Sequence, residues 1–134
     1  MARGARSARM RRPIRSFKDL IAWQKAFALC LEVHRGTARF PPEERYGLSA
    51  ELRSTARSVV CAIAEGHQRA KTREYVRLLD VALRSIAELE TQILLAHRLG
   101  FFGVDSGRGL LALTDEVDRL LRALPRRVRR RLSG

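Results

Sequence analysis

The longest regular apolar pattern in the chain runs from Thr72 to Leu99, and it limits what the chain can fold into. Apolar side chains recur there at alternating spacings of four and three residues, the period of one face of an α-helix. These positions are Tyr75, Leu79, Ala82, Ile86, Leu89, Ile93 and Ala96. A second stripe lies beside the first, at Leu78, Val81, Ser85, Glu88, Gln92 and Leu95. A helix with so wide a face is unstable alone in water, so other helices must cover it.

A first helix is expected from about residue 17 to residue 39, ended by Pro41 and Pro42, because proline cannot continue the helical hydrogen-bond ladder. Its apolar spacing predicts a buried seam of Leu20, Trp23, Phe27, Cys30 or Leu31, and His34. A second helix is expected from Leu48 to Glu65, with Gly66 as the residue that ends it. Its predicted seam is Leu48, Leu52, Thr55 or Ala56, Val59 and Ile63.

The helix that begins near Thr72 is expected to end at Gly100, and the apolar segment 101–104 then closes one end of the fold. A last helix follows, from between Asp105 and Gly109 to Leu124, where Pro125 ends it. Its predicted seam is Leu110, Leu113, Val117, Leu120 and Leu124. Amphipathic helices joined by short connections predict an all-α fold, an antiparallel up-down-up-down four-helix bundle.

The positive charge of the chain is concentrated at its two ends. The net charge is +13, yet residues 16–121 carry only +1. Residues 1–15 contain six Arg, residues 122–134 contain six more, and neither segment contains an acid. Such segments attract polyanions by long-range steering and counterion release. A GC-rich coding sequence also favours Arg over Lys, but it does not explain why the charge gathers at the ends.

The predicted organisation is therefore a basic disordered arm over residues 1–16, the bundle over 17–124 and a basic tail over 125–134. More basic residues are expected to cluster around the connection between the second and third helices, where Arg69, Arg73 and Arg77 share one helix face. The members of this cluster are Arg53, Arg57, Arg69, Lys71, Arg73 and Arg77. The alternative interpretation of that strip is an ordinary solvated surface. The predicted nucleic-acid contacts are Arg9, Arg11, Arg12, Arg15, Arg53, Arg57, Arg69, Lys71, Arg73, Arg77, Arg126, Arg127, Arg129, Arg130 and Arg131.

Few aromatic side chains are expected at the surface, since aromatic residues make up 6% of the chain and several fall on predicted seams. Base stacking therefore has little support from the sequence, and contacts to backbone phosphates with weak sequence specificity are expected instead.

Four segments of the sequence together resemble a known family. They are FKDLIAWQKA (17–26), FPPEERYGLSAELR (40–53), IAEG (63–66) and ALRSIAELETQ (82–92). The pattern is similar to that of bacterial four-helix-bundle proteins encoded in intervening sequences of 23S ribosomal RNA genes. Those proteins are related in fold to the accessory protein of diversity-generating retroelements. The resemblance spans about residues 17–124 and leaves both Arg-rich ends outside.

This resemblance implies a bundle that assembles into a ring-like homo-oligomer, typically a pentamer, with no established enzymatic activity. The retroelement relative is held to bind nucleic acid and to partner a reverse transcriptase. Where the family often reads SIPSNIAEG, this chain reads SVVCAIAEG over residues 58–66, which predicts a more regular second helix. A frequent glycine of the family is Arg84 here, at a position where glycine would permit close helix approach.

A polar network is expected inside the bundle, formed by Glu65, Ser85, Glu88 and Gln92. We interpret it as a set of hydrogen bonds that fixes helix register, and a functional polar site is the alternative. No catalytic residue is predicted, because the sequence lacks P-loop, G-x-S-x-G and G-x-G-x-x-G motifs. None of His34, His67 and His97 follows an Arg at the spacing found in helical-bundle ribonucleases.

No metal or other cofactor is expected. The Glu-x-x-His pairs of di-iron bundles are absent from the sequence, and Cys30 with His34 supplies too few ligands for a site. Cys30 and Cys61 lie in apolar helical patterns, which predicts buried thiols in a reducing cytoplasm. No apolar run is long enough for a membrane span, and neither end carries the apolar face of a membrane-surface helix.

The leading interpretation is a non-enzymatic, cytoplasmic homo-oligomer that binds RNA or DNA through its Arg-rich ends and the basic connection. The alternative is a protein-interaction scaffold that recruits a partner such as a reverse transcriptase or a ribosomal factor. In that case the Arg-rich ends are incidental to the function.

Overall fold

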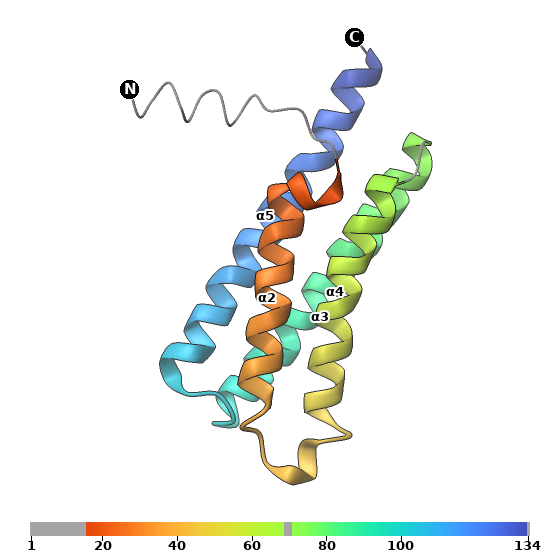
Figure 1. The fold of residues 1–134 in the computed structure, drawn as a ribbon. Helices are drawn as coiled ribbons and strands as arrows, with labels where there is room; N and C mark the ends of the chain where they lie inside the picture. Colours follow the sequence, from red (N-terminus) through yellow and green to blue (C-terminus); the bar gives the residue numbers. More distant parts are fainter. Residues whose placement is uncertain (1–15, 69–70, 134) are drawn as a thin grey trace.

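The computed structural model describes residues 16–68 and 71–133, and residues 125–133 are described by their backbone alone. This part of the chain is all-helical. Its elements are η1 (Phe17–Asp19), α2 (Ile21–Thr37), η2 (Pro42–Glu44), α3 (Leu48–Gln68), α4 (Thr72–Arg98) and α5 (Val104–Ser133). The four α-helices alternate in direction, and each contacts two others, in the order α2, α3, α4, α5 and back to α2 (Figure 1). The predicted four-helix bundle is confirmed.

Helix α4 supplies the expected apolar stripe. Leu79, Ala82, Ile86, Leu89, Ile93 and Ala96 are all buried, and Tyr75 at its start is half-buried. The second stripe behaves differently along its length, because Leu78 is buried whereas Glu88 and Leu95 are exposed. One face of α4 therefore packs against both α3 and α5. Toward the C-terminal end of α4, Glu88 and Leu95 of the second stripe remain at the surface.

Helix α3 follows its predicted seam, since Leu48, Leu52, Thr55, Ala56, Val59 and Ile63 are all buried. Its end was predicted wrongly. The helix continues to Gln68, and Gly66 lies buried inside it. A Cβ atom on Gly66 would lie 3.2 Å from the Cβ of Leu78. Gly66 therefore serves the close approach of α3 to α4 and does not terminate α3.

Helix α2 buries a different stripe from the predicted one. The buried residues are Ala22, Ala26, Leu29, Val33 and Thr37, and of the predicted seam only Leu20 is buried. Phe27 is 45% exposed, while Trp23, Cys30 and His34 are partly buried. Two stripes of apolar residues run along this helix, and the stripe with small alanines packs inward because it lets neighbouring helices approach closely.

The N-terminal boundary of the first helix also differs from the prediction. Ser16 caps a short 3₁₀ turn, in which the Ser16 hydroxyl accepts from Lys18 N and the Asp19 carboxylate accepts from Ser16 N. Leu20 then takes an extended conformation, so α2 begins only at Ile21.

One end of the bundle is closed by aromatic side chains, as expected from the segment 101–104. The Phe40 ring lies 4.8 Å from that of Phe102 and 5.3 Å from that of Phe101, measured between centroids. Gly36 makes room for this cluster, because a Cβ there would lie 2.7 Å from Cε1 of Phe102. Val104 does not take part, since it is 61% exposed and begins α5.

Helix α5 buries Leu110, Thr114, Val117, Leu121 and Leu124, while the predicted Leu113 and Leu120 are only partly buried. Thr114 is accommodated because its hydroxyl donates to the Leu110 carbonyl at 2.7 Å. The helix does not end at Pro125 but continues to Ser133. A proline inside a helix removes one hydrogen bond and costs about 3 kcal/mol, so the continuation of α5 departs from the usual effect of this residue.

Candidate nucleic-acid interface

The predicted phosphate contacts fall into three groups. Arg9, Arg11, Arg12, Arg15 and Arg69 lie outside the described residues. Arg126, Arg127, Arg129, Arg130 and Arg131 belong to the last turns of α5, of which the backbone alone is described. The remaining predicted contacts can be placed with their side chains: Arg53, Arg57, Lys71, Arg73 and Arg77.

These basic residues do not form the single cluster that was predicted around the α3–α4 connection. Arg53 and Arg57 lie in the N-terminal half of α3. Arg57 is separated from Gln68, the last residue of α3, by about 16 Å at about 1.5 Å per helical residue. Closeness in sequence to the α3–α4 connection did not predict closeness in space, because each residue of an α-helix lies about 1.5 Å further along the helix axis.

Arg53 is turned toward α2. Its Nε donates to the Thr37 hydroxyl at 2.8 Å, and its Nη2 donates to the His34 carbonyl oxygen at 3.3 Å. The last carbonyl groups of a helix lack partners within the helix. Half-buried Arg53 therefore joins α3 to the C-terminal turn of α2, and part of its donor capacity is already used.

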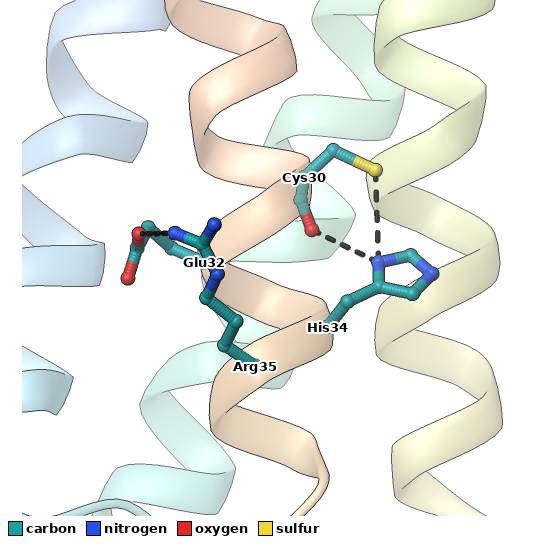
Figure 2. Close-up of polar contacts among 4 residues, drawn as sticks. All are labelled: Cys30, Glu32, His34 and Arg35. Carbon is teal, nitrogen blue, oxygen red and sulfur yellow. Dashed lines mark hydrogen bonds and ion pairs between the residues drawn. The ribbon is translucent and has the colours of Figure 1, made fainter.

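Arg57 is exposed and contacts His34 across the α2–α3 boundary, with Arg57 Nη1 3.3 Å from His34 Nε2. His34 Nδ1 lies 2.9 Å from the Cys30 carbonyl oxygen and 3.8 Å from Cys30 Sγ, as Figure 2 shows. Since a carbonyl only accepts, Nδ1 carries the hydrogen, and Nε2 accepts from Arg57. Arg57 is thus hydrogen-bonded to a neutral imidazole, and among the described side chains no carboxylate forms a salt bridge with it.

The basic residues near the α3–α4 connection are exposed. Lys71 precedes α4, and Arg73 and Arg77 lie one turn apart on it. Arg77 pairs with Glu74 at 3.0 Å, so its charge is balanced locally, as the alternative interpretation expected for this strip. Near the end of α5, Arg122 is likewise paired with Asp118, at 3.0 Å.

The four predicted polar residues do not act as one network. Ser85 shares a hydrogen bond of 3.1 Å with Ser58 of α3, while Gln92 donates to Glu88 at 3.4 Å on the surface of α4. Glu65 is exposed near the end of α3, and no hydrogen bond within the described part of the chain joins it to the other three. The Ser58–Ser85 contact alone bridges two helices.

Sequence reasoning missed an aromatic surface formed by η1 and α2. We call Phe17, Trp23 and Phe27 the aromatic stripe. The Trp23 and Phe27 rings are stacked at 5.0 Å with an interplanar angle of 19°, and the edge of Phe17 meets Trp23 at 5.2 Å. The sequence did contain a signal for this surface. A second apolar stripe fits the helical period equally well, and assigning that stripe to the core leaves Trp23 and Phe27 outside it. Its members are Ala22, Ala26, Leu29 and Val33.

The cysteines differ in their surroundings. Cys61 is exposed, contrary to the prediction, and Cys30 is partly buried. Burial raises the pKa of the Cys30 thiol above its ordinary value, an effect that the charge of Arg57 opposes. Both thiols are free, and the described side chains contain no group of three metal-ligating residues.

The structure also bears on membranes. None of the helices it describes combines the length and the apolar character that crossing a bilayer requires.

Comparison with known proteins identifies the family. The family described as 23S rRNA-intervening sequence protein matches residues 18–123, which cover all of α2, α3 and α4 and most of α5. A similar fold is found in a crystal structure of a protein of unknown function from the S23 ribosomal protein family of Bacteroides thetaiotaomicron. The TM-score is 0.74 at 17% identity, over 81% of this chain and 98% of that chain. No curated protein matches. Because the family match spans the whole bundle, the chain belongs to the 23S rRNA-intervening sequence proteins.

Proposed function

We propose that this protein is a non-enzymatic, cytoplasmic nucleic-acid-binding protein that holds RNA or DNA electrostatically at one end of its bundle. The observation that carries the proposal is the separation of charge: a net charge of +13 on the chain, of which residues 16–121 carry only +1. In this proposal the nearly neutral helical body folds the chain, and the two Arg-rich ends bind the nucleic acid. The family's association with ribosomal RNA genes supports the same conclusion.

The arrangement of the helices strengthens the argument. The start of η1, the last turns of α5 and the α3–α4 connection lie at the same end of the bundle (Figure 1). The arm of residues 1–15 is joined to Ser16 at that end, and Lys71 and Arg73 lie there as well. Positive charges gathered at one end of the bundle raise the positive electrostatic potential there. A polyanion that binds at this end releases its condensed counterions, which favours binding.

We also propose that the protein is a homo-oligomer, with a ring, typically of five copies, as the form implied by its resemblance. Leu95 of α4 and Leu99, which directly follows α4, are 52% and 56% exposed. Contact with a second copy would remove this apolar surface from water. A ring would repeat the basic end in every subunit and multiply weak contacts by avidity. Light scattering tests this, and a monomer at micromolar concentration would contradict it.

A salt titration of nucleic-acid binding tests the main proposal. If about six phosphates are neutralised, the logarithm of the affinity should fall with the logarithm of salt concentration with a slope of about −4 to −5. Replacing Arg126, Arg127, Arg129, Arg130 and Arg131 by Gln, and separately removing residues 1–15, should each weaken binding and make the slope shallower. Binding that does not depend on salt would contradict an electrostatic mechanism.

The second candidate is a scaffold that recruits a protein such as a reverse transcriptase or a ribosomal factor. The exposed apolar residues that favour a homo-oligomer also suit such a partner. Affinity purification after nuclease treatment separates the two functions. A partner retained without nucleic acid favours the scaffold, and loss of all bound material favours nucleic-acid binding.

A further inference from the structure

We propose that the aromatic stripe, together with Arg57 and His34, forms a track that binds single-stranded nucleic acid, with bases on the rings and a phosphate at Arg57. This inference rests on the proposed function and names the class of nucleic acid. It differs from the sequence-based expectation, which gave base stacking little support. Three observations carry it: the packed rings, of which Phe27 is exposed, the guanidinium without a carboxylate partner, and the place where the cationic arm joins the bundle.

The three rings form a stacking surface that is preorganised before any ligand binds. Trp23 and Phe27 lie nearly parallel, and Phe17 packs edge-on against Trp23, so each ring holds its neighbour in place. Phe27 remains 45% exposed and is available to a flat ligand. Every base has a π-face, and stacking on protein aromatics is therefore tolerant of sequence.

Arg57 and His34 provide the polar end of the track. The Arg57 guanidinium has five N–H donors, and its one hydrogen bond among the described residues goes to the uncharged His34 ring. A phosphate could accept two parallel hydrogen bonds from this guanidinium while the His34 contact fixes its direction. Phe27 and His34 are two helical turns apart, about 10 Å along the axis, so base and phosphate contacts can belong to one strand.

Charge favours a polyanion over a second copy of the chain on this surface. Residue 15, the last of the acid-free arm, is bonded to Ser16, and Ser16 adjoins Phe17 at one end of the stripe. Arg57 lies at the other end. The nearest carboxylate on α2, Glu32, points to the opposite side of the helix, where it pairs with Arg35 at 2.9 Å (Figure 2). A strand on this track would meet the aromatic surface and then the positive charge of Arg57.

Trp23 makes the proposal measurable, because it is the only tryptophan in the chain. A twelve-nucleotide oligouridine should quench the fluorescence of Trp23 in the full-length protein, and a duplex RNA of equal length should bind more weakly. Phe27→Ala should weaken oligouridine binding about tenfold, and Phe27→Tyr should restore most of it. Leu94→Ala is the matched control, because it removes a 38% exposed apolar side chain from α4, which does not contact α2 in the described bundle.

Arg57→Gln gives a second test that leaves the rings intact. It should weaken oligouridine binding severalfold, whereas Arg84→Gln, which removes the same charge from an exposed position on α4, should change it less. Circular dichroism shows whether each variant is folded.

Three results would overturn the track: salt-dependent binding that leaves Trp23 fluorescence unchanged, equal affinity for single strand and duplex, or a Phe27→Ala variant that becomes a smaller oligomer while keeping its full affinity. Each of these leaves the proposed function standing. Absence of any salt-dependent binding, to single strand or duplex, would instead contradict the proposed function itself.

Discussion

The two ends of the bundle differ in the side chains they gather: aromatic rings at one end and positive charge at the other. At one end, Phe40, Phe101 and Phe102 close the space between helices, and Gly36 makes room for them. At the other end, η1 follows the first Arg-rich segment, and the last turns of α5 belong to the second (Figure 1). The closed end gains stability by removing aromatic surface from water, whereas the basic end gathers charge that would repel itself without a polyanion.

From this difference we infer that the proposed binding is separable from folding. Helix packing holds the bundle together, and nearly all the excess charge lies outside residues 16–121. A change at the closed end should therefore alter stability, and a change at the basic end should alter binding. The following variants test this division between stability and binding, and the variant with the largest expected effect comes first.

Phe102→Ala should be the most damaging of these substitutions to stability. Phe102 is 5% exposed and packs edge-on against Phe40, so its loss leaves a cavity that costs about 3–5 kcal/mol of unfolding free energy. Urea denaturation measures the loss, with the surface variant Leu94→Ala as its control. The nucleic-acid affinity of the folded variant should remain unchanged, and a reduced affinity would show that the two ends are coupled.

Arg53→Gln should lower stability by about 1–3 kcal/mol, because it leaves the C-terminal turn of α2 and Thr37 without their charged donor. Arg73→Gln is the matched control at the basic end, where the side chain is exposed. We expect Arg73→Gln to change stability by less than about 0.5 kcal/mol and to weaken binding. The reverse pattern would mean that Arg53 contacts nucleic acid directly.

The two thiols report on the middle of the bundle. Cys61 is exposed, while burial raises the pKa of the Cys30 thiol. A raised pKa means less thiolate at pH 8, so iodoacetamide should modify Cys61 severalfold faster than Cys30, and modification of Cys30 should accelerate as the pH rises. Mass spectrometry of peptides measures both rates, with the urea-unfolded chain as control. Equal rates in the native protein would show that α2 and α3 separate readily.

Glu74→Gln should have the smallest effect. It breaks the exposed pair with Arg77 at the basic end, and such pairs contribute less than about 1 kcal/mol to stability. It also leaves Arg77 without its carboxylate, so the affinity for oligouridine should rise slightly at low salt. Fluorescence titration with Asp80→Gln as control measures the change. A decrease in affinity would mean that the pair positions Arg77.

The candidate interface was harder to predict than the fold. The sequence identified the Arg-rich ends, because charge needs no neighbour to be recognised. It grouped Arg53 with the predicted binding residues and did not foresee that Arg53 is bonded to the end of α2. It placed Trp23 and Phe27 in the core, although Phe27 is exposed and Trp23 is only partly buried. Both cases concern the direction of a side chain, which depends on the helix that packs beside it.

By itself, the sequence determined the number of helices, the inward faces of α3 and α4 and the concentration of charge at both ends. Those features follow from local spacing and composition, which act within one helix or one segment. Tertiary structure alone decided which stripe of α2 is buried, whether Gly66 ends α3 or lets α4 approach, and whether α5 continues past Pro125. In each of these cases two local solutions are close in energy, and the choice depends on how closely neighbouring helices can pack.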